Sequence, residues 1–152
     1  MAFMAYPYFI TIPLFFIIIT WNFKFYNSFE DIEDDFLKEK DSGFTERLLE
    51  LIQKSGQKNS AIYKKANISK QHFSKIRNNP DYKPTKPTAI ALALALELDL
   101  EQTKELIGRA GYALTNSSKF DLIIQFFIQQ KNYNIIEINI ALYEFDQTLL
   151  GV

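Results

Sequence analysis

The chain has 152 residues, of which 47% are hydrophobic, so it is long enough to bury one sizeable core and to carry an appendage. It contains no cysteine and a single histidine, His72, which excludes disulfides, thiolate metal sites and histidine clusters.

The net charge of −1 is the sum of two blocks of opposite sign. Residues 30–41 contain seven acids and two lysines, whereas residues 58–86 contain eight basic side chains and one acid, Asp81. Because a polyanion responds to the local field rather than to the net charge, the second block is a candidate contact surface.

Residues 1–23 contain no charged side chain and are rich in Phe, Ile, Tyr and Leu. A membrane-spanning helix needs about 20 such residues and tolerates kinks of the kind that Pro7 and Pro13 introduce. No basic region precedes this apolar run and no small-residue cleavage site follows it, which argues against a secretory signal. A transmembrane helix is one interpretation, and a buried strand or a translation start placed too far upstream are the others.

Residues 24–43 are mainly acidic and predict a solvated linker or a short amphipathic helix, which Gly43 ends. We favour the solvated linker over the alternative, in which these acidic residues form an interaction surface. From residue 44 to 54 apolar side chains recur at helical spacing, which predicts a core-facing helix that Gly56 ends.

Residues 57–79 predict two short helices, over 60–66 and 70–77, joined by a tight turn. Asn67 suits the left-handed backbone conformation that a sharp turn needs, Ile68 can fill the angle between the helices, and Ser69 can cap the second helix. We expect Phe73 and Ile76 to lie in the core, so the polar side chains of the second helix face outward.

Residues 82–87 read as an exposed basic loop. The run AIALALALEL over 89–98 alternates like a strand, but Ala and Leu are strong helix formers, and Thr85 is a suitable cap for a helix. Asp99 and Gln102 predict a capping box for the next helix, which Gly108 and Gly111 end.

Two more apolar helical patterns follow, over 120–130 and 135–149, with a turn at 132–134. The second is expected to bury Ile135, Ile138, Leu142, Phe145 and Leu149 on one face. Such faces are covered either by the domain itself or by a second copy of the chain. We expect packing on the domain, with partial use in dimerisation.

Residues 44–112 resemble the phage-repressor (Cro/C1, Xre) type of helix-turn-helix domain. The resemblance rests on an apolar residue early in the first motif helix, a turn residue followed by an apolar plug, a recognition-helix run, and a Pro-Thr loop before two further helices. The matching residues are Ile62, Asn67, Ile68, Ser69, Phe73, Ser74, Ile76, Pro84 and Thr85. The family usually has Ala where this chain has Tyr63, so the ring should splay the two helices or turn to their edge.

The resemblance implies an all-α, lambda-repressor-like five-helix domain over 44–114, with two extra C-terminal helices over 118–150. It also implies sequence-specific binding of double-stranded DNA by a dimeric, cytoplasmic transcription regulator. Lys70, Gln71 and Lys75 match the family's base-contacting positions, and Asn59 matches a phosphate anchor. The full set of candidate DNA-binding residues is Asn59, Ser69, Lys70, Gln71, His72, Ser74, Lys75, Arg77, Asn78 and Lys83.

Two alternatives remain open from the sequence. One is a protein-interaction module in which the apolar C-terminal helices form the docking surface. The other is a membrane-tethered regulator that residues 1–23 anchor, with its DNA-binding domain in the cytoplasm. Carboxylate pairs lack a nucleophile or metal-ligand partner, and no glycine-rich phosphate loop occurs, so we expect neither an enzyme nor a metal or cofactor site.

Overall fold

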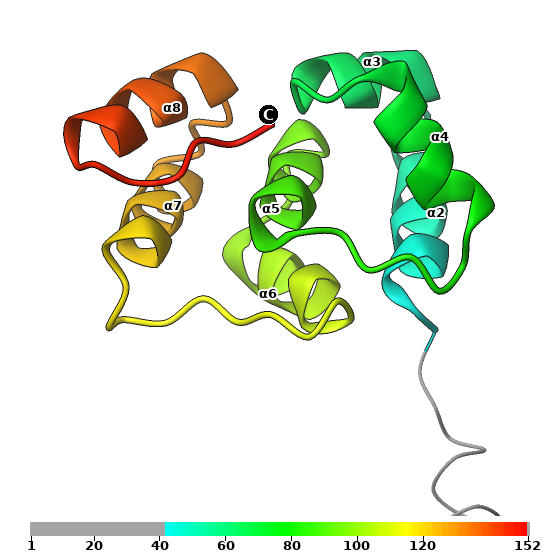
Figure 1. Cartoon of the computed structure of the whole chain (residues 1–152), viewed down its shortest axis with the longest axis horizontal. Coiled ribbons are helices and arrows are strands. Elements are labelled where there is room, and N and C mark those ends of the chain that lie inside the picture. Colours follow the sequence, from blue (N-terminus) through cyan, green and yellow to red (C-terminus); the bar gives the residue numbers. More distant parts are fainter. Residues whose placement is uncertain (1–41, 152) are drawn as a thin grey trace, which may run out of the picture. The chain divides into compact units, whose positions relative to one another are not determined.

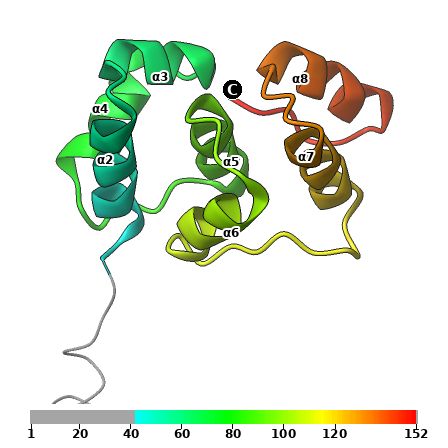
Figure 2. The ribbon, with the colours of Figure 1, turned by 180° about the vertical axis from the view of Figure 1, so that it is seen from behind.

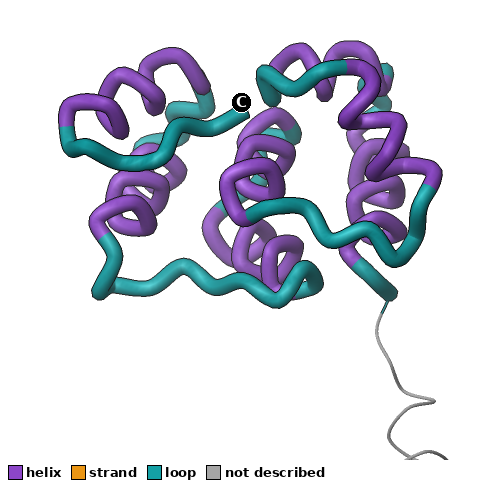
Figure 3. Tube along the Cα trace, viewed as in Figure 1, coloured by secondary structure: helices purple, strands orange, loops and turns teal. Residues whose placement is uncertain are grey.

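The computed structural model describes residues 42–151, which form seven α-helices and no strand (Figures 1 and 3). The helices are α2 (Phe44–Ser55), α3 (Asn59–Lys65), α4 (Lys70–Asn78), α5 (Lys86–Ala95), α6 (Leu100–Gly108), α7 (Lys119–Gln129) and α8 (Ile135–Glu144). The prediction of an all-α fold is confirmed for these residues. The predictions for residues 1–23, and for all but the last two of residues 24–43, lie outside the described residues.

The turn between α3 and α4 has the predicted local features. Asn67 has a left-handed backbone, with φ of 54°, and Ile68 is buried beneath the turn. The hydroxyl of Ser69 accepts a hydrogen bond from the backbone N–H of His72 and so caps α4. The chain therefore reverses within three residues, and the two helices pack against each other around Ile62 and Phe73.

Helix α5 lies in the middle of the described residues, with α2 to α4 on one side of it and α7 and α8 on the other (Figures 1 and 2). The hydroxyl of Thr85 caps its N-terminus, and every residue from Thr88 to Ala95 is buried. This explains the misleading sequence alternation. A helix that is buried on all sides needs no apolar stripe, so the sequence period carries no information about which face is inside.

Helix α6 begins with the predicted capping box. The carboxylate of Asp99 accepts from the N–H of Gln102, whose side-chain oxygen accepts from the N–H of Asp99. Glu105 on the same helix accepts hydrogen bonds from Arg47 of α2 and from Arg109. Burial raises the pKa of Glu105, but hydrogen bonds and charge from the two guanidinium groups lower it by more than burial raises it. The net pKa of Glu105 is therefore below the ordinary value.

Helices α7 and α8 pack on the rest of the domain, as expected. Ile124 and Ile128 of α7 and Ile138 and Leu142 of α8 belong to the same hydrophobic core as α5. No helix of residues 42–151 has both the length and the apolar character needed to cross a bilayer.

The predicted extent of the last helix was wrong. Helix α8 ends at Glu144 rather than Leu149, because the backbone turns left-handed at Asp146, with φ of 54°. Phe145, expected on the buried face, is 55% exposed. The residues after it run back as a loop and bury Leu150 completely.

Candidate nucleic-acid interface

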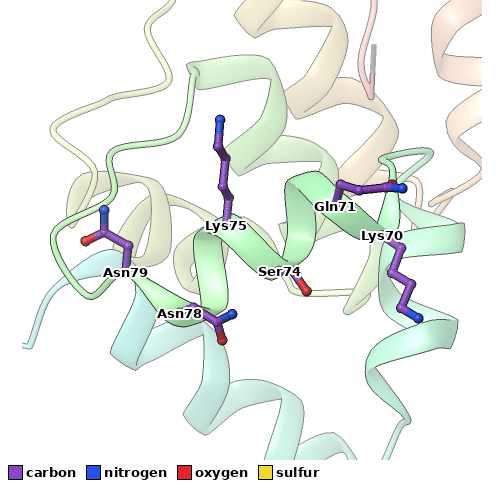
Figure 4. Close-up of a pocket in the computed structure, with 6 residues that line it drawn as sticks. All are labelled: Lys70, Gln71, Ser74, Lys75, Asn78 and Asn79. Atoms are coloured by element: carbon purple, nitrogen blue, oxygen red, sulfur yellow. The ribbon is translucent and has the colours of Figure 1, made fainter.

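The outer face of α4 is polar and continuous. Phe73 and Ile76 point into the core, and at about 100° per residue the side chains at 70, 71, 74, 75 and 78 fall within an arc of about 140° on the other side. Together with Asn79 they line an open hollow of about 580 Å³. Figure 4 shows the six side chains spread along the helix, with Lys70 and Gln71 toward one end and Asn78 and Asn79 at the other.

Five of the predicted site residues therefore share this face: Lys70, Gln71, Ser74, Lys75 and Asn78. Arg77 lies at its edge, where its Nε donates a hydrogen bond to Asn78 Oδ1 at 3.2 Å. An extended partner could therefore form hydrogen bonds with several side chains of this one helix at the same time.

His72 lies at the other edge of this face and has a hydrogen-bonding partner that the sequence did not predict. Its Nε2 lies 3.3 Å from the hydroxyl of Tyr82, and the two rings meet edge to face. His72 is half-buried, and these two residues line a second hollow with Gln71 and Lys75. The only sequence signal for Tyr82 is an aromatic residue in the polar loop that follows α4.

Three further predicted residues, Asn59, Ser69 and Lys83, lie neither on this face nor at its edges. The hydroxyl of Ser69 is engaged as the cap of α4, and Asn59 is the half-buried first residue of α3. The ammonium of Lys83 lies 5.3 Å from the centre of the Tyr112 ring, a cation–π contact that directs it toward the end of α6. These residues are placed for support or for peripheral contacts rather than on the face of α4.

Two of the eight basic side chains in residues 58–86 are paired with acids. Lys86 was assigned to an exposed loop, but it is the first residue of α5, and its Nζ lies 2.6 Å from Asp121 Oδ1. Lys65 pairs with Glu97 at 3.1 Å. The remaining six basic side chains form no ion pair with any described residue: Lys58, Lys64, Lys70, Lys75, Arg77 and Lys83.

These six cations have few acids beside them. Residues 58–80, which include all of α3 and α4, contain no Asp or Glu. The acids of α2 and α6 are engaged mainly with basic partners on those helices, such as Glu50 with Lys54 and Arg47. The described residues therefore produce a positive field around α3 and α4, although the net charge of the chain is −1.

Tyr63, the departure from the family pattern, packs against a core residue of α4. Its half-exposed ring lies 5.8 Å from the ring of Phe73 at an angle of 43°, while its neighbours Ile62 and Ala66 are fully buried. The ring therefore packs against α4 and stays partly open to solvent.

Comparison of this chain with models of protein families, with curated proteins and with solved structures found no match. Within residues 42–151 no three acidic or histidine side chains gather as metal ligands would. What the described surface offers is a helix with a continuous row of amide, hydroxyl and ammonium groups in a positive field.

Proposed function

We propose that this protein is a transcription regulator that binds double-stranded DNA sequence-specifically through α4. The single observation that supports the proposal is the outer face of α4, where Lys70, Gln71, Ser74 and Lys75 lie side by side and unpaired with acids of the described residues. In this reading residues 44–114 are a lambda-repressor-like helix-turn-helix domain, and α4 is its recognition helix.

The chemistry of this face suits the major groove, which is about 12 Å wide and admits one α-helix. Lysine can donate to guanine O6 and N7, glutamine pairs with adenine N6 and N7, and serine serves either. Arg77, Asn78 and Asn79 at the end of the helix would contact phosphates, which position the helix without reading sequence.

The first experiment measures the affinity of the full chain for random duplex DNA by fluorescence anisotropy at about 50 and 200 mM salt. If four to six phosphates are neutralised, the affinity should fall roughly a hundredfold or more between these two salt concentrations. Lys70→Glu/Lys75→Glu should abolish binding at either salt concentration.

The matched control is Lys119→Glu/Lys131→Glu, which changes the net charge equally on exposed residues away from α4. It should retain most of the wild-type affinity. Equal loss in both variants would show that only net charge matters, and absence of binding by the wild type at the lower salt would reject the DNA proposal. If binding is found, selection from a randomised duplex pool tests its sequence specificity.

A second candidate, protein interaction, is favoured by α8. Ile136, Ile140 and Tyr143 recur at helical spacing on one face and are 69%, 58% and 72% exposed. Such a stripe fits self-association through the C-terminal helices, which would supply the dimer expected of a two-half-site DNA binder. Sedimentation velocity of the wild type and of Ile140→Lys tests this, because the substitution should shift a dimer to monomer.

Membrane association remains a proposal that rests on residues 1–23 alone. Both the tethered form and the untethered form require the DNA-binding domain to face the cytoplasm. Carbonate extraction of membranes separates them, because only a spanning segment keeps the protein in the pellet.

A further inference from the structure

The segment formed by residues 149–151 lies against the turn between α3 and α4, although more than 80 residues separate them in the sequence. Figures 1 and 2 both place the end of this segment beside the end of α3. Gly151 is buried there, with a left-handed backbone of φ 69°. A Cβ at this position would overlap the carbonyl oxygen of Ala66 and would lie 2.8 Å from both Cβ and the carbonyl oxygen of Asn67.

The segment is held from the other side by α8. The side-chain oxygen of Asn139 accepts from the N–H of Leu150 at 2.8 Å, and its amide nitrogen donates to the Leu150 carbonyl at 3.1 Å. One side chain thus satisfies both backbone groups of a residue outside regular secondary structure. The side chain of Leu150 is fully buried in the core that also contains Ile62 and Ala66.

We infer that residues 149–151 form a latch that holds the α3–α4 turn in place, with Gly151 and Asn139 as its positioning residues. Asn67 and Ile68 set the direction in which α4 leaves the turn, and the latch packs directly on Asn67. Displacement of the latch would free the turn and change the orientation of α4. The consequence for DNA binding rests on the proposed function, whereas the contact between latch and turn does not.

Gly151→Ala tests the latch because it inserts a methyl group into the contact with the turn. Gly56→Ala is a matched control. Gly56 also has a left-handed backbone, with φ of 66°, but no atom lies within 4 Å of the position of its added Cβ. Both substitutions place alanine at a similar left-handed φ, so a difference between them reports the contact with Ala66 and Asn67.

Amide hydrogen exchange gives a readout at the turn itself. The N–H of Asn67 donates a hydrogen bond to the carbonyl oxygen of Lys64 at 3.1 Å, and the N–H of Ile68 donates one to the carbonyl oxygen of Tyr63 at 3.0 Å. In Gly151→Ala both amides should exchange about tenfold faster than in Gly56→Ala, while the amides of α6 should exchange at equal rates in the two variants. Equal exchange of Asn67 and Ile68 in the two variants would overturn the latch.

Asn139→Ala provides a second route should Gly151→Ala fail to fold, because it removes both hydrogen bonds to Leu150 without adding atoms. It should also speed exchange at Asn67 and Ile68, and Asn139→Asp, which sets a carboxylate oxygen against the Leu150 carbonyl oxygen, should do the same. If neither effect occurs, Asn139 does not act on the turn and the latch is rejected.

DNA affinity completes the test. At about 50 mM salt, Gly151→Ala should bind random duplex about fivefold or more weakly than Gly56→Ala, because a reoriented helix misaligns its phosphate contacts. Faster exchange with equal affinities would refute the link to the interface. If the wild type binds no DNA, the proposed function fails, and hydrogen exchange alone decides the latch.

Discussion

Helices α4 and α5 follow each other in the chain, are of similar length and begin with the same kind of hydroxyl cap, yet they use their residues in opposite ways. Helix α5 buries every residue from Thr88 to Ala95, whereas α4 buries only Phe73 and Ile76 and turns its polar side chains outward. Packing therefore constrains nearly all of α5 and little of α4. Substitutions in α5 should change stability, and substitutions on the outer face of α4 should change binding.

The largest effect on stability is expected in α5. Leu92 is fully buried at the centre of the domain, so Leu92→Ala removes apolar contacts and leaves a cavity. We expect the free energy of unfolding to fall by about 2–5 kcal/mol, measured by urea denaturation. Gln71→Ala on α4, where the side chain is exposed, should stay within about 0.5 kcal/mol of wild type. If both variants lose a similar free energy of unfolding, packing does not constrain α5 more than α4.

The next effect concerns the start of α5. Asp121 of α7 is 1% exposed; its Oδ1 has Lys86 as its partner, and its Oδ2 accepts from the N–H and the hydroxyl of Thr115. Asp121→Ala leaves these donors without an acceptor and should cost about 2–3 kcal/mol, less than for a fully buried pair because Lys86 is partly exposed. Glu144→Ala, an exposed acid on α8, is the control and should be neutral. A cost below about 0.5 kcal/mol for Asp121→Ala would mean that the ion pair does not anchor α7 to α5.

A smaller effect is expected at the cap of α4. Ser69→Ala removes the acceptor for the His72 N–H and should lower stability by about 1 kcal/mol. Ser69→Asp, which keeps an acceptor at the cap, should retain most of the stability. Ser60→Ala, on the exposed side of α3, serves as the control in thermal denaturation. If Ser69→Ala costs no more than Ser60→Ala, the cap does not stabilise α4.

The smallest expected effect is a pH dependence that comes from α2 and α6 rather than from α4, which carries no acid. Hydrogen bonds from Lys54 and then Arg47 lower the pKa of Glu50 from 4.5 to about 2, and the net pKa of Glu105 is also lowered. A carboxylate with a lowered pKa in the folded state contributes stability above its ordinary pKa and loses it as the pH falls. Stability should therefore decline below pH 4.5, the ordinary value for both groups.

Glu105→Gln checks this assignment. The variant lacks one of the two titrating groups, so its melting temperature should fall less than that of wild type between about pH 6 and pH 3. An identical decline in both proteins would show that Glu105 contributes nothing to acid sensitivity.

The sequence by itself determined the features that depend on a few neighbouring residues. Asn67 sets the turn, Ser69 caps α4, and Asp99 with Gln102 caps α6, because each acts on a backbone group at most three residues away. The polar face of α4 was predictable for the same reason, since helical spacing alone places Lys70, Gln71 and Lys75 together once Phe73 and Ile76 are in the core.

Only the tertiary structure decided which groups from distant parts of the chain meet. Lys86 pairs with Asp121, and Tyr82 approaches His72. The loops between these residues bring them together, and no short-range sequence pattern predicts the paths of those loops. The early end of α8 has the same origin. Its apolar pattern could continue to Leu149, but the chain leaves the helix, buries Leu150, and places Gly151 on the α3–α4 turn. Burial and steric fit at such contacts depend on the packing of the whole domain, which helical spacing does not encode.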